Sequence, residues 1–311
     1  MHMADALPDY PIHDVSDWPA VNDEPMGTKP KYWLRRADDV RWLFKQKHRP
    51  HSDDDWSEKI ASELAALLGV PHATVELASR RGERGIITRD MVAACGAEEL
   101  VHGNSLLVEA DPGYPTEGIY HIAHHTVERI FSVFEARQIG LPPDGGFAPE
   151  VADARDLFVG YLLFDAWIGN TDRHHENWAA LKFGNDHYVL APSYDHASSL
   201  GHNVQDDQRS DRLVTQVEAR RVAAYARKAR SAIYRTEVDR KAVSTDEAFT
   251  LAGAARQPAG RYWLDRLRRI DDDDATHIVR RVPGVIMSEP AKRFADRLLR
   301  ENRVRLLALT A

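Results

Sequence analysis

Residues 164–181, with the sequence FDAWIGNTDRHHENWAAL, place six polar side chains shortly after an apolar run. Such a segment could be a solvated turn, a metal site or the loop of an enzyme that transfers phosphoryl groups. Phosphoryl transfer needs a carboxylate for the acceptor hydroxyl, oxygen ligands for Mg²⁺ and a cation on the phosphates. The six residues that could meet these needs are Asp172, Arg173, His174, His175, Glu176 and Asn177.

Asp172 and Asn177 have the D-x-x-x-x-N spacing that the catalytic loop of protein kinases uses for its base and a metal ligand. In those enzymes a second metal-binding aspartate follows, and here a predicted hairpin ends at Asp195. Lys45 on an earlier predicted strand and Glu58 on the next helix could be the phosphate-binding lysine and its carboxylate partner. Each match alone is common by chance, whereas all of them in this order favour phosphoryl transfer over a solvated turn.

The adjacent His174 and His175 raise the alternative of a zinc site. Neighbouring residues on one element point apart, the chain has no H-E-x-x-H pattern, and Cys95 is its only cysteine, so this donor set suits zinc poorly. We instead expect His174 to brace the loop by a hydrogen bond and Arg173 to pair with a carboxylate or a phosphorylated side chain. Three further histidines are predicted to lie on a helix surface: His121, His124 and His125.

The predicted elements of the first third of the chain form a small sheet with one inserted helix. Residues 31–47 are rich in aromatic and branched side chains around a turn, which predicts a β-hairpin with Lys45 on its second strand. The strongest helix signal follows over residues 54–69, with Asp54 or Asp55 as its N-cap and a glycine at its end. Two more strands are predicted, at residues 72–79 and 85–92.

The rest of the chain is predicted to be mainly helical. Long helices are expected over residues 120–140 and 149–170, and the second is very apolar and leads directly to the candidate loop. A hairpin is predicted at residues 176–195. Further helices are predicted near residues 211–232, 260–270, 275–282 and 289–309.

This order of elements predicts an α+β, bilobal architecture. An extended N-terminal lead-in would cover residues 1–26, and a small β-rich N-lobe would cover residues 27–93. A larger helical C-lobe with the catalytic loop would cover residues 94–311.

The segments WIGNTDRHHENWAAL, LAPSYDHASSLG and WLFK…SEKIASELAALLGV resemble the HipA-like serine/threonine kinases, and the resemblance covers most of the chain. It implies a bilobal protein-kinase-like fold, ATP with Mg²⁺, and transfer of the γ-phosphoryl group to serine or threonine. Asp172 would then be the catalytic base, and Asn177 and Asp195 would hold Mg²⁺. Lys45 would contact the ATP phosphates, and Glu58 would orient Lys45.

The loop expected to cover the phosphates, MGTKPK at residues 26–31, contains one glycine and lacks the usual glycine-rich fingerprint. Backbone N–H groups and lysine charge would bind phosphate here, from Gly27, Thr28, Lys29 and Lys31. Some members of the family phosphorylate a serine of this loop, a role that would fall here to Thr28 or Ser52. HipA toxins also carry an extra N-terminal subdomain and act beside a DNA-binding antitoxin.

Composition limits the setting and the partners. The formal net charge of −7 argues against a broad nucleic-acid surface, and no apolar stretch reaches the ~18 residues of a membrane helix. A single cysteine and the absence of a basic, apolar leader favour a reducing, cytoplasmic setting. We therefore expect a cytoplasmic protein that contacts neither nucleic acid nor membrane directly.

The leading interpretation is an ATP- and Mg²⁺-dependent kinase for a serine or threonine of a cytosolic bacterial protein. The resemblance adds the toxin of a toxin–antitoxin module, with an antitoxin partner, as one role. The D-R-H-x-x-N loop is also similar to that of phosphatidylinositol kinases, which leaves a lipid or small-molecule kinase as an alternative. A non-catalytic, nucleotide-binding regulator is the third interpretation.

Overall fold

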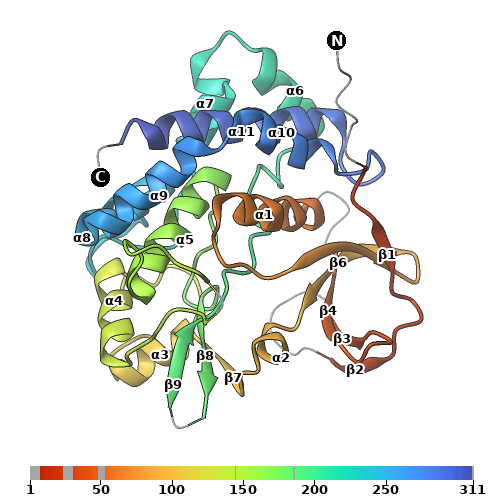
Figure 1. Ribbon diagram of the computed structural model, residues 1–311. Coiled ribbons are helices and arrows are strands. Elements are labelled where there is room, and N and C mark those ends of the chain that lie inside the picture. Colours follow the sequence, from red (N-terminus) through yellow and green to blue (C-terminus); the bar gives the residue numbers. More distant parts are fainter. Residues whose placement is uncertain (1–7, 24–30, 48–52, 144, 185, 310–311) are drawn as a thin grey trace.

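The computed structural model describes residues 8–23, 31–47, 53–143, 145–184 and 186–309. Within these ranges, a six-stranded sheet occupies one side of the molecule and helices occupy the other (Figure 1). The chain is therefore α+β, with a β-sheet N-terminal region and a helical C-terminal region. This confirms the predicted fold class, while the predicted domain boundaries stay a prediction.

The six-stranded sheet has the strand order β1-β5-β6-β4-β3-β2. Its strands are β1 (Ile12–Asp14), β2 (Ala20–Asp23), β3 (Lys31–Arg35), β4 (Arg41–Gln46), β5 (Val75–Arg80) and β6 (Glu83–Arg89). The β1–β5 pair is parallel and the other pairs are antiparallel. Lys45 on β4 lies opposite Lys31 on β3 and Ile86 on β6, so the predicted hairpin and the place of Lys45 on its second strand are confirmed.

Helix α1 (Asp54–Leu68) joins the sheet to the helical region (Figure 1). It packs against β5 and β6 on one side and against the helices α5 (Ala154–Ile168) and α10 (Asp272–Arg280) on the other, and it is therefore buried over most of its length. Gly69 ends it in the left-handed conformation at a φ of 85°, as predicted. The prediction that Asp54 or Asp55 caps it is wrong, because both lie in its first turn and Asp53 is the N-cap residue.

The helical region is built around α5 (Ala154–Ile168), which is apolar on all sides and almost wholly buried. The helices α8 (Thr245–Ala255), α9 (Gln257–Arg269) and α11 (Glu289–Leu307) pack around it. The other helices are α2 (Met91–Cys95), α3 (Gly103–Ala110), α4 (Val127–Ala136), α6 (Asp206–Val214), α7 (Val222–Ala226) and α10 (Asp272–Arg280). A small antiparallel sheet contains β7 (Glu99–His102), β8 (Ala179–Phe183) and β9 (His187–Leu190), in that order.

Some elements differ from their predicted ranges for local reasons. The helix predicted over residues 120–140 begins only at Val127, because the Thr126 side chain accepts a hydrogen bond from the Arg129 N–H and caps the helix there. The helix predicted near residues 211–232 is broken into α6, a 3₁₀ turn (Glu218–Arg220) and α7. Residues of the predicted lead-in supply β1 and β2, and β7, α2, α3 and α8 were not predicted.

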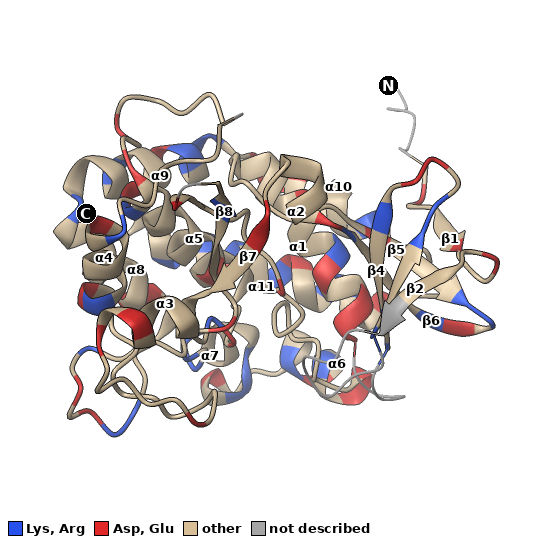
Figure 2. Cartoon of the chain, turned by 90° about the horizontal axis from the view of Figure 1, so that it is seen from below, with Lys and Arg blue, Asp and Glu red and all other residues tan. Residues whose placement is uncertain are grey.

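Charged residues of both signs are spread over the two regions. In the view from below, Lys and Arg are interspersed with Asp and Glu on the sheet and on the helices (Figure 2). In this view neither sign of charge occupies one region alone.

Of the helices that the structure describes, none combines the length and the apolar character needed to cross a membrane.

Candidate active site

Lys45, Glu58 and Asp195 lie together between the sheet and the helical region. The Lys45 Nζ atom is 3.1 Å from Glu58 Oε1 and 3.5 Å from Asp195 Oδ1. The Glu58 side chain is 4% exposed and that of Lys45 14%, so water screens this pair only weakly. Burial alone would lower the pKa of Lys45, but the Asp195 and Glu58 carboxylates overcome it and hold the pKa above its ordinary value. Lys45 is therefore a fixed cation between two distant parts of the chain.

Asp195 follows β9 and has an unusual backbone conformation. Its φ of 56° lies in the left-handed region, which non-glycine residues adopt rarely. The nearby Ser193 fixes the segment, because its N–H donates to the Pro71 oxygen at 2.8 Å and its oxygen accepts from the Ala73 N–H at 2.9 Å. Strain of this kind persists only where the surroundings impose it. Here the imposed conformation places the Asp195 carboxylate beside Lys45.

Arg173 anchors the loop that the sequence marks as catalytic. Its side chain is 1% exposed, and its Nε and Nη2 atoms donate to the Asp165 carboxylate of α5 at 2.7 and 2.8 Å. It also donates to the Asn177 backbone oxygen at 2.6 Å and to Ser193 Oγ at 2.9 Å. Burial alone would lower the pKa of Arg173, but the Asp165 carboxylate reverses that effect and the pKa is raised. One buried cation thus connects α5, the loop and the segment after β9.

Asp172 and Asn177 are linked within this loop. The Asn177 Nδ2 atom donates to the Asp172 backbone oxygen at 2.7 Å, and the Asp172 N–H donates to Asn170 Oδ1 at 3.2 Å. Because Nδ2 is used in this way, Oδ1 is the atom of the Asn177 amide that can meet a cation. The Asp172 side chain is 25% exposed and forms a hydrogen bond with the Tyr120 side chain. The backbone of Asp172 is thus held within the loop, while its carboxylate remains partly open to solvent.

His174 braces the loop from inside, as the sequence suggested. Its Nδ1 atom accepts a hydrogen bond from the Glu176 N–H at 3.2 Å, and its ring lies edge-on to that of Tyr120 at 5.6 Å. Burial lowers the pKa of His174 to about 4, although the Asp195 carboxylate acts in the opposite direction. His174 is therefore neutral at pH 7.

The prediction that three histidines lie on a helix surface is wrong. His121, His124 and His125 precede α4 rather than lie on it, because the cap at Thr126 delays the start of the helix. His125 is 1% exposed, and its Nε2 atom accepts a hydrogen bond from Trp178 Nε1 at 3.0 Å. Burial lowers the pKa of His125 to about 3.

Four residues that hold the loop in place were missed from the sequence: Asp165, Asn170, Ser193 and His196. Asn170 Nδ2 donates to Asp165 Oδ1 at 2.8 Å, and Ser193 Oγ lies 2.8 Å from His196 Nε2. A carboxylate inside an apolar helix is a signal that could have identified Asp165, since buried charges need partners. Ser193 and His196 carry no comparable signal, because their partner Arg173 is identified only by the fold.

The predicted phosphate loop is only partly described. Gly27, Thr28 and Lys29 lie outside the described residues. Lys31 is described, and it begins β3 directly opposite Lys45. The C-terminal end of the predicted loop therefore runs beside the candidate site.

The oxygen atoms of Asn177 and Asp195 are donors of the kind that Mg²⁺ takes in proteins. A hollow of about 10 Å³, with room for roughly one water molecule, is lined by Lys45, Glu58 and Asp195 among others. Among the residues that the structure describes, no group of three or more His, Cys, Asp or Glu side chains is arranged to hold a metal. In phosphoryl-transfer sites Mg²⁺ takes one or two protein ligands together with substrate phosphates and water, and Asn177 and Asp195 are two residues that could act as such ligands.

The chain is similar to a known protein family and to solved structures. The family model described as the HipA-like C-terminal domain matches residues 24–249, which include all the candidate site residues. No curated protein matches the sequence.

Solved structures are also similar in fold, among them the following two. The Helicobacter pylori proinflammatory kinase CtkA has a TM-score of 0.71 and 19% identity, over 96% of this chain and 100% of that chain. A chain of the Shewanella oneidensis MR-1 toxin–antitoxin complex of HipA, HipB and operator DNA has a TM-score of 0.57 and 14% identity. That match covers 93% of this chain and 66% of the other. At these identities the likeness shows a shared fold.

Replacing Arg173 by Met should destabilise the protein, because it leaves the Asp165 carboxylate buried without its cation. The expected loss in the free energy of unfolding is about 3–5 kcal/mol, measured by urea denaturation. The double variant Arg173→Met/Asp165→Leu should recover part of that loss, since a buried ion pair can be replaced by apolar side chains of similar volume. A loss well under 1 kcal/mol in the single variant would contradict the anchoring role.

Acidification should destabilise the fold through its buried histidines. The folded chain keeps His174 and His125 neutral down to pH of about 4 and about 3, whereas the unfolded chain protonates them near 6.5. The unfolded state thus binds more protons, and stability should fall by about 2 kcal/mol per histidine between pH 7 and pH 5. Urea denaturation at both pH values should show a weaker pH dependence in His125→Gln, but not in the exposed control His187→Gln. An equal pH dependence in all three proteins would contradict this account.

Proposed function

The chain belongs to the family of HipA-like C-terminal domains, and on this premise we propose that it is a kinase that uses ATP and Mg²⁺ to phosphorylate serine or threonine in a protein. The observation that carries the proposal is the ion-paired Lys45, held between Glu58 and Asp195. Protein kinases hold their phosphate-contacting lysine with a helix-borne glutamate in this way. The anchored loop with Asp172 and Asn177 supports the same function.

In the proposed reaction, Asp172 accepts the proton of the acceptor hydroxyl as that oxygen bonds to the γ-phosphorus of ATP. The bond from this phosphorus to the oxygen that bridges the β- and γ-phosphates breaks, and ADP leaves. The partial exposure of Asp172 gives the acceptor access, and the acceptor hydroxyl takes the place of the Tyr120 side chain on the carboxylate. His174 stays neutral and keeps the loop in shape.

The charge of the phosphates is met by several groups of the chain. Asn177 through Oδ1 and Asp195 through its carboxylate would hold Mg²⁺, which supplies charge neutralisation on the phosphates when bound. Lys45 contacts the phosphates, and Glu58 keeps the Nζ atom of Lys45 oriented toward them. The loop residues proposed to cover the phosphates are Gly27, Thr28, Lys29 and Lys31.

A protein acceptor and a protein partner complete the proposal. One similar chain belongs to a complex of HipA, HipB and operator DNA, so an antitoxin is the partner class to test, and a toxin role for this chain would follow from it. A lipid or small-molecule kinase would use the same loop residues and differ only in its acceptor. A non-catalytic nucleotide-binding regulator would bind ATP without transferring its γ-phosphoryl group.

Incubation with γ-labelled ATP, Mg²⁺ and a bacterial lysate should label protein on serine or threonine, and chelation of the metal should abolish labelling. Asp172→Asn should lower the rate of transfer by about 100-fold or more, because it removes the base. Asp195→Asn should also lower it strongly, because it removes a charged metal ligand. Mass spectrometry identifies the labelled residue and its protein.

A matched control for these variants is Asp186→Asn, which makes the same change on a 78% exposed residue beside the turn between β8 and β9. It should leave the rate of transfer unchanged. Label found in lipid or small molecules would favour the alternative acceptors. Absence of transfer by the wild type, or equal transfer by Asp172→Asn, would refute the kinase proposal.

A further inference from the structure

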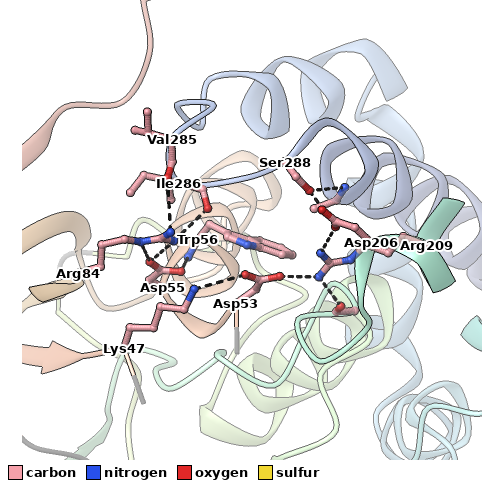
Figure 3. Close-up of polar contacts among 12 residues, drawn as sticks. Lys47, Asp53, Asp55, Trp56, Arg84, Asp206, Arg209, Val285, Ile286 and Ser288 are labelled. Atoms are coloured by element: carbon pink, nitrogen blue, oxygen red, sulfur yellow. Dashed lines mark hydrogen bonds and ion pairs between the residues drawn. The ribbon is translucent and has the colours of Figure 1, made fainter. Parts of the chain in front are cut away.

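The N-terminal end of α1 determines where Glu58 lies. The helix begins at Asp54, and Glu58 follows about one turn later. A movement of this end would therefore carry Glu58 away from Lys45. Two arginines from different parts of the chain hold it, Arg209 of α6 and Arg84 of β6 (Figure 3).

Arg209 holds the helix end from the helical region. Its side chain is 3% exposed, and its Nη2 atom donates to Asp53 Oδ2 at 2.7 Å and to the Gly201 backbone oxygen at 3.1 Å. Its guanidinium also lies 5.6 Å from the ring centroid of Trp56, in the first turn of α1. Gly201 belongs to the segment that follows Asp195, so this arginine ties the start of α1 to the segment that continues from the candidate metal ligand.

Arg209 is itself fixed by a second carboxylate. Its Nη1 atom donates to Asp206 Oδ1 at 2.8 Å, and the Ser288 hydroxyl donates to the same oxygen at 2.9 Å (Figure 3). Ser288 is the N-cap residue of α11. Asp206 of α6 and Ser288 at the start of α11 thus orient the guanidinium that contacts Asp53.

Arg84 holds the same helix end from the sheet. Its Nη2 and Nε atoms donate to Asp55 Oδ2 at 2.6 and 3.0 Å, and Nη2 also donates to the Ile286 backbone oxygen at 2.9 Å (Figure 3). Arg84 lies on β6 close to Ile86, the residue opposite Lys45 on β4. The contact therefore connects the sheet beside Lys45, the start of α1 and the segment between α10 and α11.

Buried ion pairs such as these differ from exposed ones in how they affect the stability of the fold. Burial raises the pKa of Asp55 even though the Arg84 guanidinium acts against it, so the ionised pair adds little to stability. Losing one partner of a buried pair is nevertheless costly, because the other charge remains buried alone. Exposed pairs such as Arg220 with Asp211 contribute little to stability, because water screens them. The buried contacts are therefore better suited to fixing geometry than to adding stability.

We propose that Arg209 and Arg84, with their partners Asp53 and Asp55, form a two-arginine clamp that positions α1 so that Glu58 holds Lys45 before any nucleotide binds. The role of Lys45 in this proposal rests on the proposed kinase function. In protein kinases the placement of the equivalent helix is a step that activation controls. Here contacts within the chain supply that placement.

The test compares Arg209→Met with Arg209→Lys, which retains the charge, and with Arg220→Met as a matched control. Arg220 follows the end of α6 and is 60% exposed. Hydrogen exchange of the α1 amides should become about tenfold faster in Arg209→Met. The KM for ATP should rise by about tenfold with a smaller change in kcat, because the loss is one of nucleotide binding.

Arg209→Lys should bring the KM for ATP part of the way back to the wild-type value. Arg220→Met should leave both the exchange of the α1 amides and the KM for ATP at wild-type values. If Arg209→Met does not fold, Asp53→Asn, which neutralises the 21% exposed partner on α1, is measured in the same way. Hydrogen exchange requires no catalysis, so it tests whether the clamp positions α1 even if the wild type transfers no phosphate. Unchanged α1 exchange in the folded variants, or unchanged KM in an active kinase, would overturn the proposal.

Discussion

The buried ion pair between Arg173 and Asp165 is the constraint on which the candidate site depends. A charge alone in this interior would cost several kcal/mol, so the two side chains must remain together. Arg173 also uses the Asn177 backbone oxygen and Ser193 Oγ, which places three chain segments around one guanidinium. The positions of α5, of the loop with Asp172 and of the segment that leads to Asp195 are thus set by one group.

The opposite side of the site depends on α1. This helix is buried between the sheet and the helical region, and it carries Glu58 to Lys45 while backbone contacts of Ser193 bring Asp195 to the same lysine. The strained backbone of Asp195 indicates that this meeting is imposed by the surrounding structure. Lys45, which lies on the sheet, is therefore ion-paired both to Glu58 of α1 and to Asp195 of the segment after β9.

The sequence predicted the fold class and indicated the candidate site residues, because both leave local signals. Lys45 lies in a patterned hairpin, Glu58 in a strongly periodic helix, and Asp172 and Asn177 in a spaced motif. What could not be predicted depends on contacts between distant segments. The place of His125 follows from a cap at Thr126, and the partners of Arg173 and Arg209 come from residues that only the fold brings near.

The most direct test of the central claim is a crystal structure of the protein with Mg²⁺ and a non-hydrolysable ATP analogue. In that structure a metal ion should be bound by Asn177 Oδ1 and the Asp195 carboxylate. Lys45 Nζ should also lie on the phosphates while it keeps its contact with Glu58. A nucleotide bound away from these residues, or a metal ion held without them, would contradict the central claim.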